Sequence, residues 1–138
     1  MLYPLKFQPI LKDKIWGGIK LKSIFEKKAL TDKLGESWEL SGYENDESEV
    51  VNGFLAGNNL AELIEIYMGE LIGDKVYEQY GLSFPLLFKL IDANENLSIQ
   101  VHPGDEVAME RHSSFGKTEM WYVLDADQGA ELIIGFAR

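Results

Sequence analysis

The chain has 138 residues, 46% of them hydrophobic and 12% aromatic, a composition typical of a globular domain with a sizeable core. Its formal net charge of −10 argues against a nucleic-acid surface, which needs clustered Lys and Arg, and the absence of cysteine excludes disulfides and thiolate metal sites. No apolar run is long enough to span a membrane, and the first residues lack the order of a signal peptide. A cytoplasmic protein that contacts neither membrane nor nucleic acid is therefore expected.

The N-terminal part is predicted to be mostly extended. Residues 1–20 read as extended segments divided by Pro and Gly, and LKSIFEK (21–27) predicts a short helix. GESWELS (35–41) alternates polar and apolar residues, as a strand with one buried face does, and an extended pattern resumes at 49–51. Strands around an acidic turn are therefore expected here.

A change of period then predicts a helical insertion at about residues 58–80. Apolar residues recur at helical spacing at Leu60, Leu63, Ile64, Tyr67 and Leu71. Asn59 is placed to cap the first helix, with Glu62 at the position of a capping-box partner. Gly69 and Gly73 suggest a break, so the segment predicts two short helices.

After Gly81 the sequence predicts strands again. FPLLFKLIDA (84–93) and NLSIQVHP (96–103) are expected to pair as a hairpin, followed by a loop or short helix. KTEMWYVLDA (117–126) and AELIIGFAR (130–138) predict two more strands. Short strands separated by turns favour a mainly β fold, a sandwich or barrel, with one helical insertion.

Two of these predicted strands carry polar side chains that point the same way. Gln100 and His102 share a face because they lie two residues apart, and Ser98 lies on that face too. Glu119 can meet them if its strand lies nearby. An imidazole, a carboxylate and an amide oxygen form a credible set of ligands for zinc or another divalent metal. A solvated sheet face explains the same spacing, so the residues alone leave both readings open.

The strings LSIQVHP and GKTEMWY, with IWGG and GESWELS nearer the N-terminus, closely resemble the type I mannose-6-phosphate isomerases in their short bacterial form. The resemblance covers essentially the whole chain. It implies a cupin-like antiparallel jelly roll that carries one zinc ion and contains an inserted helical part. Residues 1–138 would then be a single catalytic domain, the N-terminal portion of the enzyme, incomplete at its C-terminus.

The resemblance also implies roles for individual residues. Gln100, His102 and Glu119 match metal ligands, and Lys117 matches an active-site lysine. Residues that match substrate-binding positions are Ser98 and Lys89, for the phosphate, and Trp16, an aromatic near the pocket. Glu36 and Glu39 are interpreted as serving their strand, and His112 as a loop residue. For Lys89, a solvated lysine remains an equal alternative.

The reaction implied is the interconversion of mannose 6-phosphate and fructose 6-phosphate through a cis-enediol. The family's second metal-binding histidine and a catalytic arginine lie downstream of the part that this chain matches, so little activity is expected from it alone. The alternatives are a non-catalytic module that binds a metal or a sugar phosphate, and a structural role for the polar face. The sequence does not identify the base that abstracts the proton, the fourth metal ligand or the metal bound in the cell. It also leaves open which hexose phosphates are substrates and how many chains assemble.

Overall fold

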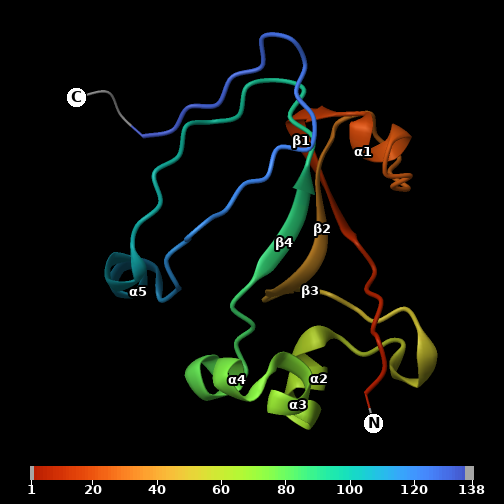
Figure 1. The fold of residues 1–138 in the computed structure, drawn as a ribbon, viewed down its shortest axis with the longest axis vertical. Coiled ribbons are helices and arrows are strands. Elements are labelled where there is room, and N and C mark those ends of the chain that lie inside the picture. Colours follow the sequence, from red (N-terminus) through yellow and green to blue (C-terminus); the bar gives the residue numbers. More distant parts are fainter. Residues whose placement is uncertain (1, 136–138) are drawn as a thin grey trace. The chain divides into compact units, whose positions relative to one another are not determined.

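An antiparallel sheet is the main feature of the computed structural model, which describes residues 2–135 (Figure 1). Its strands are β1 (Ile10–Gly18), β2 (Leu34–Tyr43), β3 (Asp46–Glu47) and β4 (Leu87–Ile91). β2 pairs with β1, with β4 and, at its C-terminal end, with β3. The expectation of an antiparallel sheet with few helices is confirmed, and β2 is the strand on which the sheet is built.

Short helices connect and flank these strands. They are α1 (Lys20–Ser23), the 3-10 turn η1 (Gly53–Leu55), α2 (Leu60–Tyr67), α3 (Gly69–Ile72), α4 (Asp74–Tyr80) and α5 (Asp105–His112). The predicted helical insertion is present as α2, α3 and α4, one helix more than expected. The capping box is confirmed: the Asn59 side chain accepts a hydrogen bond from the Glu62 amide, and the Glu62 carboxylate accepts one from the Asn59 amide.

The hydrophobic core lies where α2 meets the segment around η1. Val50, Leu55 and Leu63 form its buried centre. Partly buried apolar side chains from the N-terminal segment and the helices pack against it: Leu2, Tyr3, Leu5, Phe7, Tyr67 and Leu71. The same face of α2 that the sequence pattern marked as apolar is therefore the face that is buried.

The IWGG string joins β1 closely to its neighbours. A Cβ on Gly17 would lie 2.5 Å from the backbone of Gly35 and of Lys33, so only glycine fits there. The carbonyl oxygen of Trp16 accepts hydrogen bonds from the amides of Asn94 and Glu95. The string therefore fixes the end of β1 against β2 and against the turn after β4.

The structure divides into two compact units, one ending at Leu97 and the other beginning at Ser98. In the second unit, α5 is anchored by a hydrogen bond of 2.9 Å from the Gly116 amide to the Asp105 carboxylate. The segments on either side of α5 run extended but form no strand among residues 98–135 (Figure 1). Whether residues 1–138 act as one domain stays a prediction.

The strand predictions for this second unit were wrong in the described part of the chain. β4 pairs with β2 rather than with residues 96–103, so the expected hairpin is absent, and residues 117–126 join no ladder. The last predicted strand is unpaired as far as Gly135, and residues 136–138 lie outside the described residues. Alternation of side chains predicts two faces, but a strand also needs a partner for its backbone N–H and C=O groups.

No helix among residues 2–135 is both long and apolar enough to cross a membrane.

Candidate functional site

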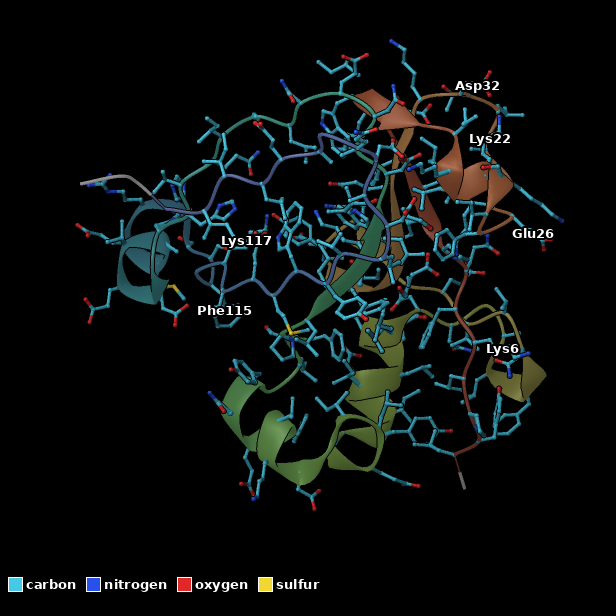
Figure 2. All side chains as sticks on the ribbon, turned by 45° about the horizontal axis from the view of Figure 1, so that its top comes forward. Lys6, Lys22, Glu26, Asp32, Phe115 and Lys117 are labelled. Atoms are coloured by element: carbon cyan, nitrogen blue, oxygen red, sulfur yellow. The ribbon has the colours of Figure 1, made fainter. Side chains whose placement is uncertain are left out.

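The second unit brings three of the predicted site residues together. The Lys117 ammonium lies 2.6 Å from Oε1 of Glu119, and Nε2 of His102 lies 3.6 Å from the same oxygen. Lys117 Nζ and His102 Nε2 are 3.4 Å apart. Figure 2 shows Lys117 on the extended segment just after Phe115. An imidazole and an ammonium group thus converge on one carboxylate oxygen.

The second oxygen of Glu119 is held by Trp121, whose indole N–H donates a hydrogen bond of 3.2 Å to Oε2. The hydrogen bond from Lys117 is the main cause that lowers the pKa of Glu119 below its ordinary value. Partial burial opposes this effect, while the Trp121 hydrogen bond and the charges of Lys117 and His102 add to it. Glu119 is therefore a carboxylate at neutral pH, the form that binds a cation.

Gln100 and Ser98 form a separate pair in the same unit. The Gln100 amide donates a hydrogen bond of 3.2 Å to the Ser98 hydroxyl, and neither side chain is hydrogen-bonded to Glu119 or His102 in the described part of the chain. The two residues share a face, as the sequence predicted.

The donor set fits a zinc ion in part. Two ligands of one tetrahedral zinc, each about 2.1 Å from the metal, lie roughly 3.4 Å apart. The separation of 3.6 Å between His102 Nε2 and Glu119 Oε1 is close to that value. No group of three His, Cys, Asp or Glu side chains converges within residues 2–135, so Gln100 is the remaining ligand that the prediction names. The imidazole and the carboxylate therefore fit the ligand separation of a zinc ion.

The first unit holds a second cluster of charges around Glu36 on β2. Lys89, on β4, donates a hydrogen bond of 3.0 Å to Oε1 of Glu36, and the Trp38 indole donates one of 2.9 Å to Oε2. Lys14, on β1, places its ammonium 3.9 Å from Oε2. Glu36 is only 7% exposed. A buried carboxylate therefore links side chains from β1, β2 and β4.

Burial is the largest influence on Glu36, and by itself it would raise the pKa of this carboxyl. The hydrogen bonds from Trp38 and Lys89, with the positive charges of the two lysines, outweigh burial and lower the pKa below its ordinary value. Glu36 is therefore ionised at neutral pH in spite of its burial.

Trp16 and Lys89, the other predicted substrate-binding residues, both belong to the first unit. A Cβ built on Gly35 would lie 2.8 Å from the Trp16 ring, so the indole packs directly over that glycine. The ammonium of Lys89 is paired with Glu36 rather than solvated. Whether either residue contacts substrate stays a prediction.

Trp121, whose indole N–H donates to Glu119, was not among the predicted site residues. Glu36 was interpreted as serving its strand, and its contacts with Trp38 on β2 and Lys89 on β4 agree with that interpretation. Trp121 follows Glu119 at the spacing at which Trp38 follows Glu36, in the alternating segment KTEMWYV. In both segments the signal is a Trp two residues after a Glu, because in an extended chain this spacing puts the indole and the carboxylate on one face.

The sheet and its helices define a protein with the cupin fold of the mannose-6-phosphate isomerases. The structure matches the crystal structure of the mannose 6-phosphate isomerase from Bacillus subtilis with a TM-score of 0.80 and 38% identity, over 91% of this chain and 39% of that one. The apo form of mannose 6-phosphate isomerase from Salmonella typhimurium gives a TM-score of 0.64 at 22% identity, covering 82% of this chain and 28% of that one, which supports the fold alone.

The chain belongs to the type I phosphomannose isomerase family, because residues 4–136 match the family's catalytic domain. It is 40% identical over 136 residues to the mannose-6-phosphate isomerase ManA of Bacillus subtilis, a match covering 96% of this chain. It is 42% identical over 135 residues to the mannose-6-phosphate isomerase of Streptococcus mutans, covering 98% of this chain. The chain spans 40% and 41% of the lengths of these relatives.

Proposed function

We propose that this chain is the N-terminal part of a cytoplasmic, metal-dependent aldose–ketose isomerase that interconverts mannose 6-phosphate and fructose 6-phosphate. The observation that carries the proposal is the convergence of His102 and Lys117 on one carboxylate oxygen of Glu119, in a chain of the type I phosphomannose isomerase family. The names of its relatives support the same substrate.

His102 and Glu119 would hold the metal, with Gln100 as the third ligand. We propose zinc, because imidazole and carboxylate are ligands that zinc accepts readily. When bound, the metal supplies a positive charge that polarises the sugar's oxygen atoms. Trp121 orients the carboxylate by donating to Oε2, so that Oε1 faces His102 and Lys117.

Lys117 is the proposed catalytic residue. In the reaction a proton leaves C2, a cis-enediol forms, and a proton returns at C1, so negative charge develops on an oxygen of the substrate. An ammonium held by Glu119 in a fixed position can donate a hydrogen bond to that oxygen without rearranging during the reaction.

Lys89 and Ser98 are proposed to bind the phosphate, and Trp16 to line the pocket. A phosphate group remote from C1 and C2 contributes binding energy that orients the reacting end of the sugar. Lys89 supports such a role because its ammonium is held in one place by Glu36.

The first test is zinc binding by the purified chain, titrated against a competing chelator. We expect His102→Ala to lose at least about tenfold in zinc affinity, the loss typical when one ligand or its orienting partner is removed. His112→Ala is the matched control, because His112 ends α5 and is not among the proposed ligands. Equal zinc affinity for both variants would contradict the proposed site.

Isomerisation of mannose 6-phosphate, assayed on the same samples with zinc present, separates an enzyme from a binding module. Weak turnover by the wild-type chain that disappears in Glu119→Gln is the expected result. Binding of the sugar phosphate that survives Glu119→Gln, with no turnover by either protein, would favour the non-catalytic module.

A further inference from the structure

Glu36 lies at the centre of the sheet and is held by one side chain from each of the strands that meet there. Lys89 of β4 contacts Oε1, while Trp38 of β2 and Lys14 of β1 approach Oε2. Because each carboxylate oxygen has its own donor, the orientation of the side chain is fixed. Glu36 in turn fixes the ammonium of Lys89, whose side chain is only 22% exposed.

The cluster around Glu36 carries a net positive charge. Its members are one carboxylate and the ammonium groups of Lys14 and Lys89, which leaves one positive charge uncompensated. The neighbouring Lys12, which lies over the Trp38 ring, does not add to it because Asp46 pairs with it at 2.5 Å. In a chain whose net charge is −10, this is a local place where an anion is favoured.

We infer that Glu36 is a positioning residue for the isomerase: it holds the ammonium of Lys89 at a fixed point on the sheet so that Lys89 can receive the phosphate of a hexose phosphate. The inference rests on the proposed role of Lys89 in phosphate binding. Glu36 does not touch the phosphate. It acts through Lys89, and its single charge leaves the pair of lysines with enough positive charge to attract a dianion.

A simpler role, a purely structural ion pair, makes a different prediction. Removing the charge of Glu36 makes the cluster more positive, so electrostatics alone predicts tighter phosphate binding. If Glu36 positions Lys89, the same change weakens binding, because a released lysine side chain must be ordered again each time a phosphate binds. The sign of the change in affinity therefore distinguishes the two roles.

Glu36→Gln is the variant to test, because it removes the charge and keeps the shape. Glu39→Gln is a matched control on the same strand. Glu39 pairs with Lys27 at 2.7 Å and accepts a hydrogen bond from Ser37, so it loses the same charge and a similar ion pair without contacting Lys89. Trp38→Phe is a second, charge-preserving variant that frees only Oε2 of Glu36.

The first readout follows Lys89 itself and needs no ligand. Correlation spectra of the 15Nζ ammonium groups show lysines whose protons are held in ion pairs, and Lys89→Arg identifies the signal of Lys89. We expect this signal to be lost or shifted in Glu36→Gln, shifted less in Trp38→Phe and unchanged in Glu39→Gln. An unchanged signal in Glu36→Gln, or in Trp38→Phe if Glu36→Gln does not fold, overturns the inference.

The second readout is affinity for mannose 6-phosphate and for inorganic phosphate, measured by calorimetry. We expect Glu36→Gln to bind about tenfold more weakly, the contribution of one charge-assisted hydrogen bond, and Glu39→Gln to bind as the wild type does. Tighter binding by Glu36→Gln overturns the inference. If the wild-type chain binds neither probe, the phosphate role of Lys89 fails, while the ammonium spectra still decide whether Glu36 positions Lys89.

Discussion

At the scale of single residues, the buried carboxylate of Glu36 gives the stability of the chain a defined pH dependence. Its pKa is lowered in the folded state relative to the ordinary value of 4.5. The unfolded chain therefore binds more protons than the folded chain as the pH falls below that value. The stabilisation is fully present above the unfolded pKa and is lost as the pH falls through the folded pKa.

We predict that the free energy of unfolding of the wild type falls on acidification below about pH 4.5. It should fall less in Glu36→Gln, which has no proton to bind at this position. Urea denaturation followed by circular dichroism over this pH range gives the comparison. Glu39→Gln is the matched variant that removes one carboxylate from the same strand without removing Glu36. Parallel pH dependence in the wild type and Glu36→Gln would contradict the prediction.

Within the candidate site, the sequence predicted contacts most directly between residues that belong to the same short motif. Lys117 and Glu119 share a face of one short string, and their contact of 2.6 Å agrees with that spacing. The approach of His102 to this pair joins segments 15 residues apart; the shared faces of two predicted strands allowed it, and the family resemblance implied it. The contact between Glu36 and Lys89 joins residues 53 apart, so no local pattern could have predicted that contact.

At the scale of elements, the helical insertion shows both what local sequence predicts and what it misses. The capping box of α2 formed as expected, because its hydrogen bonds join residues three apart. The junction between α2 and α3 was not expected. Met68 has φ 48° and ψ −128° there, a conformation that glycine adopts freely and that places the Cβ of other residues under strain.

We predict that Met68→Gly stabilises the chain by about 1 kcal/mol, because it removes this backbone strain. The Met68 side chain is 48% exposed, so little packing is lost. Met68→Ala is the control: alanine keeps the Cβ and therefore the strain, and it should not stabilise. Free energies of unfolding from urea titrations decide between the two, and equal stability of both variants would contradict the explanation from strain.

At the scale of the whole chain, the two units differ in what holds them. The first has the paired strands and the buried cluster of Val50, Leu55 and Leu63. In the second, large apolar side chains are mostly exposed, among them Met120 at 92% and Tyr122 at 82%. Composition and alternation predicted strands in both. Among the described residues, strands formed only in the first unit, where each has a partner strand. β propensity reflects packing against neighbours more than an intrinsic preference.

This difference predicts a contrast in amide hydrogen exchange across the chain. Amides of β2 are bonded to β1 and β4, so their exchange requires opening of the sheet, whereas those of residues 119–124 have no ladder and should exchange near the rate of an unfolded chain. We expect protection factors to differ by at least about a thousandfold. The Gly116 amide, which donates to Asp105, is an internal control that should exchange more slowly than its neighbours.

Strong protection of residues 119–124 would show that they pair in solution. Protection that increases with protein concentration would assign that pairing to a second copy of the chain, since exposed, unpaired strand-like segments with apolar side chains readily add to one another.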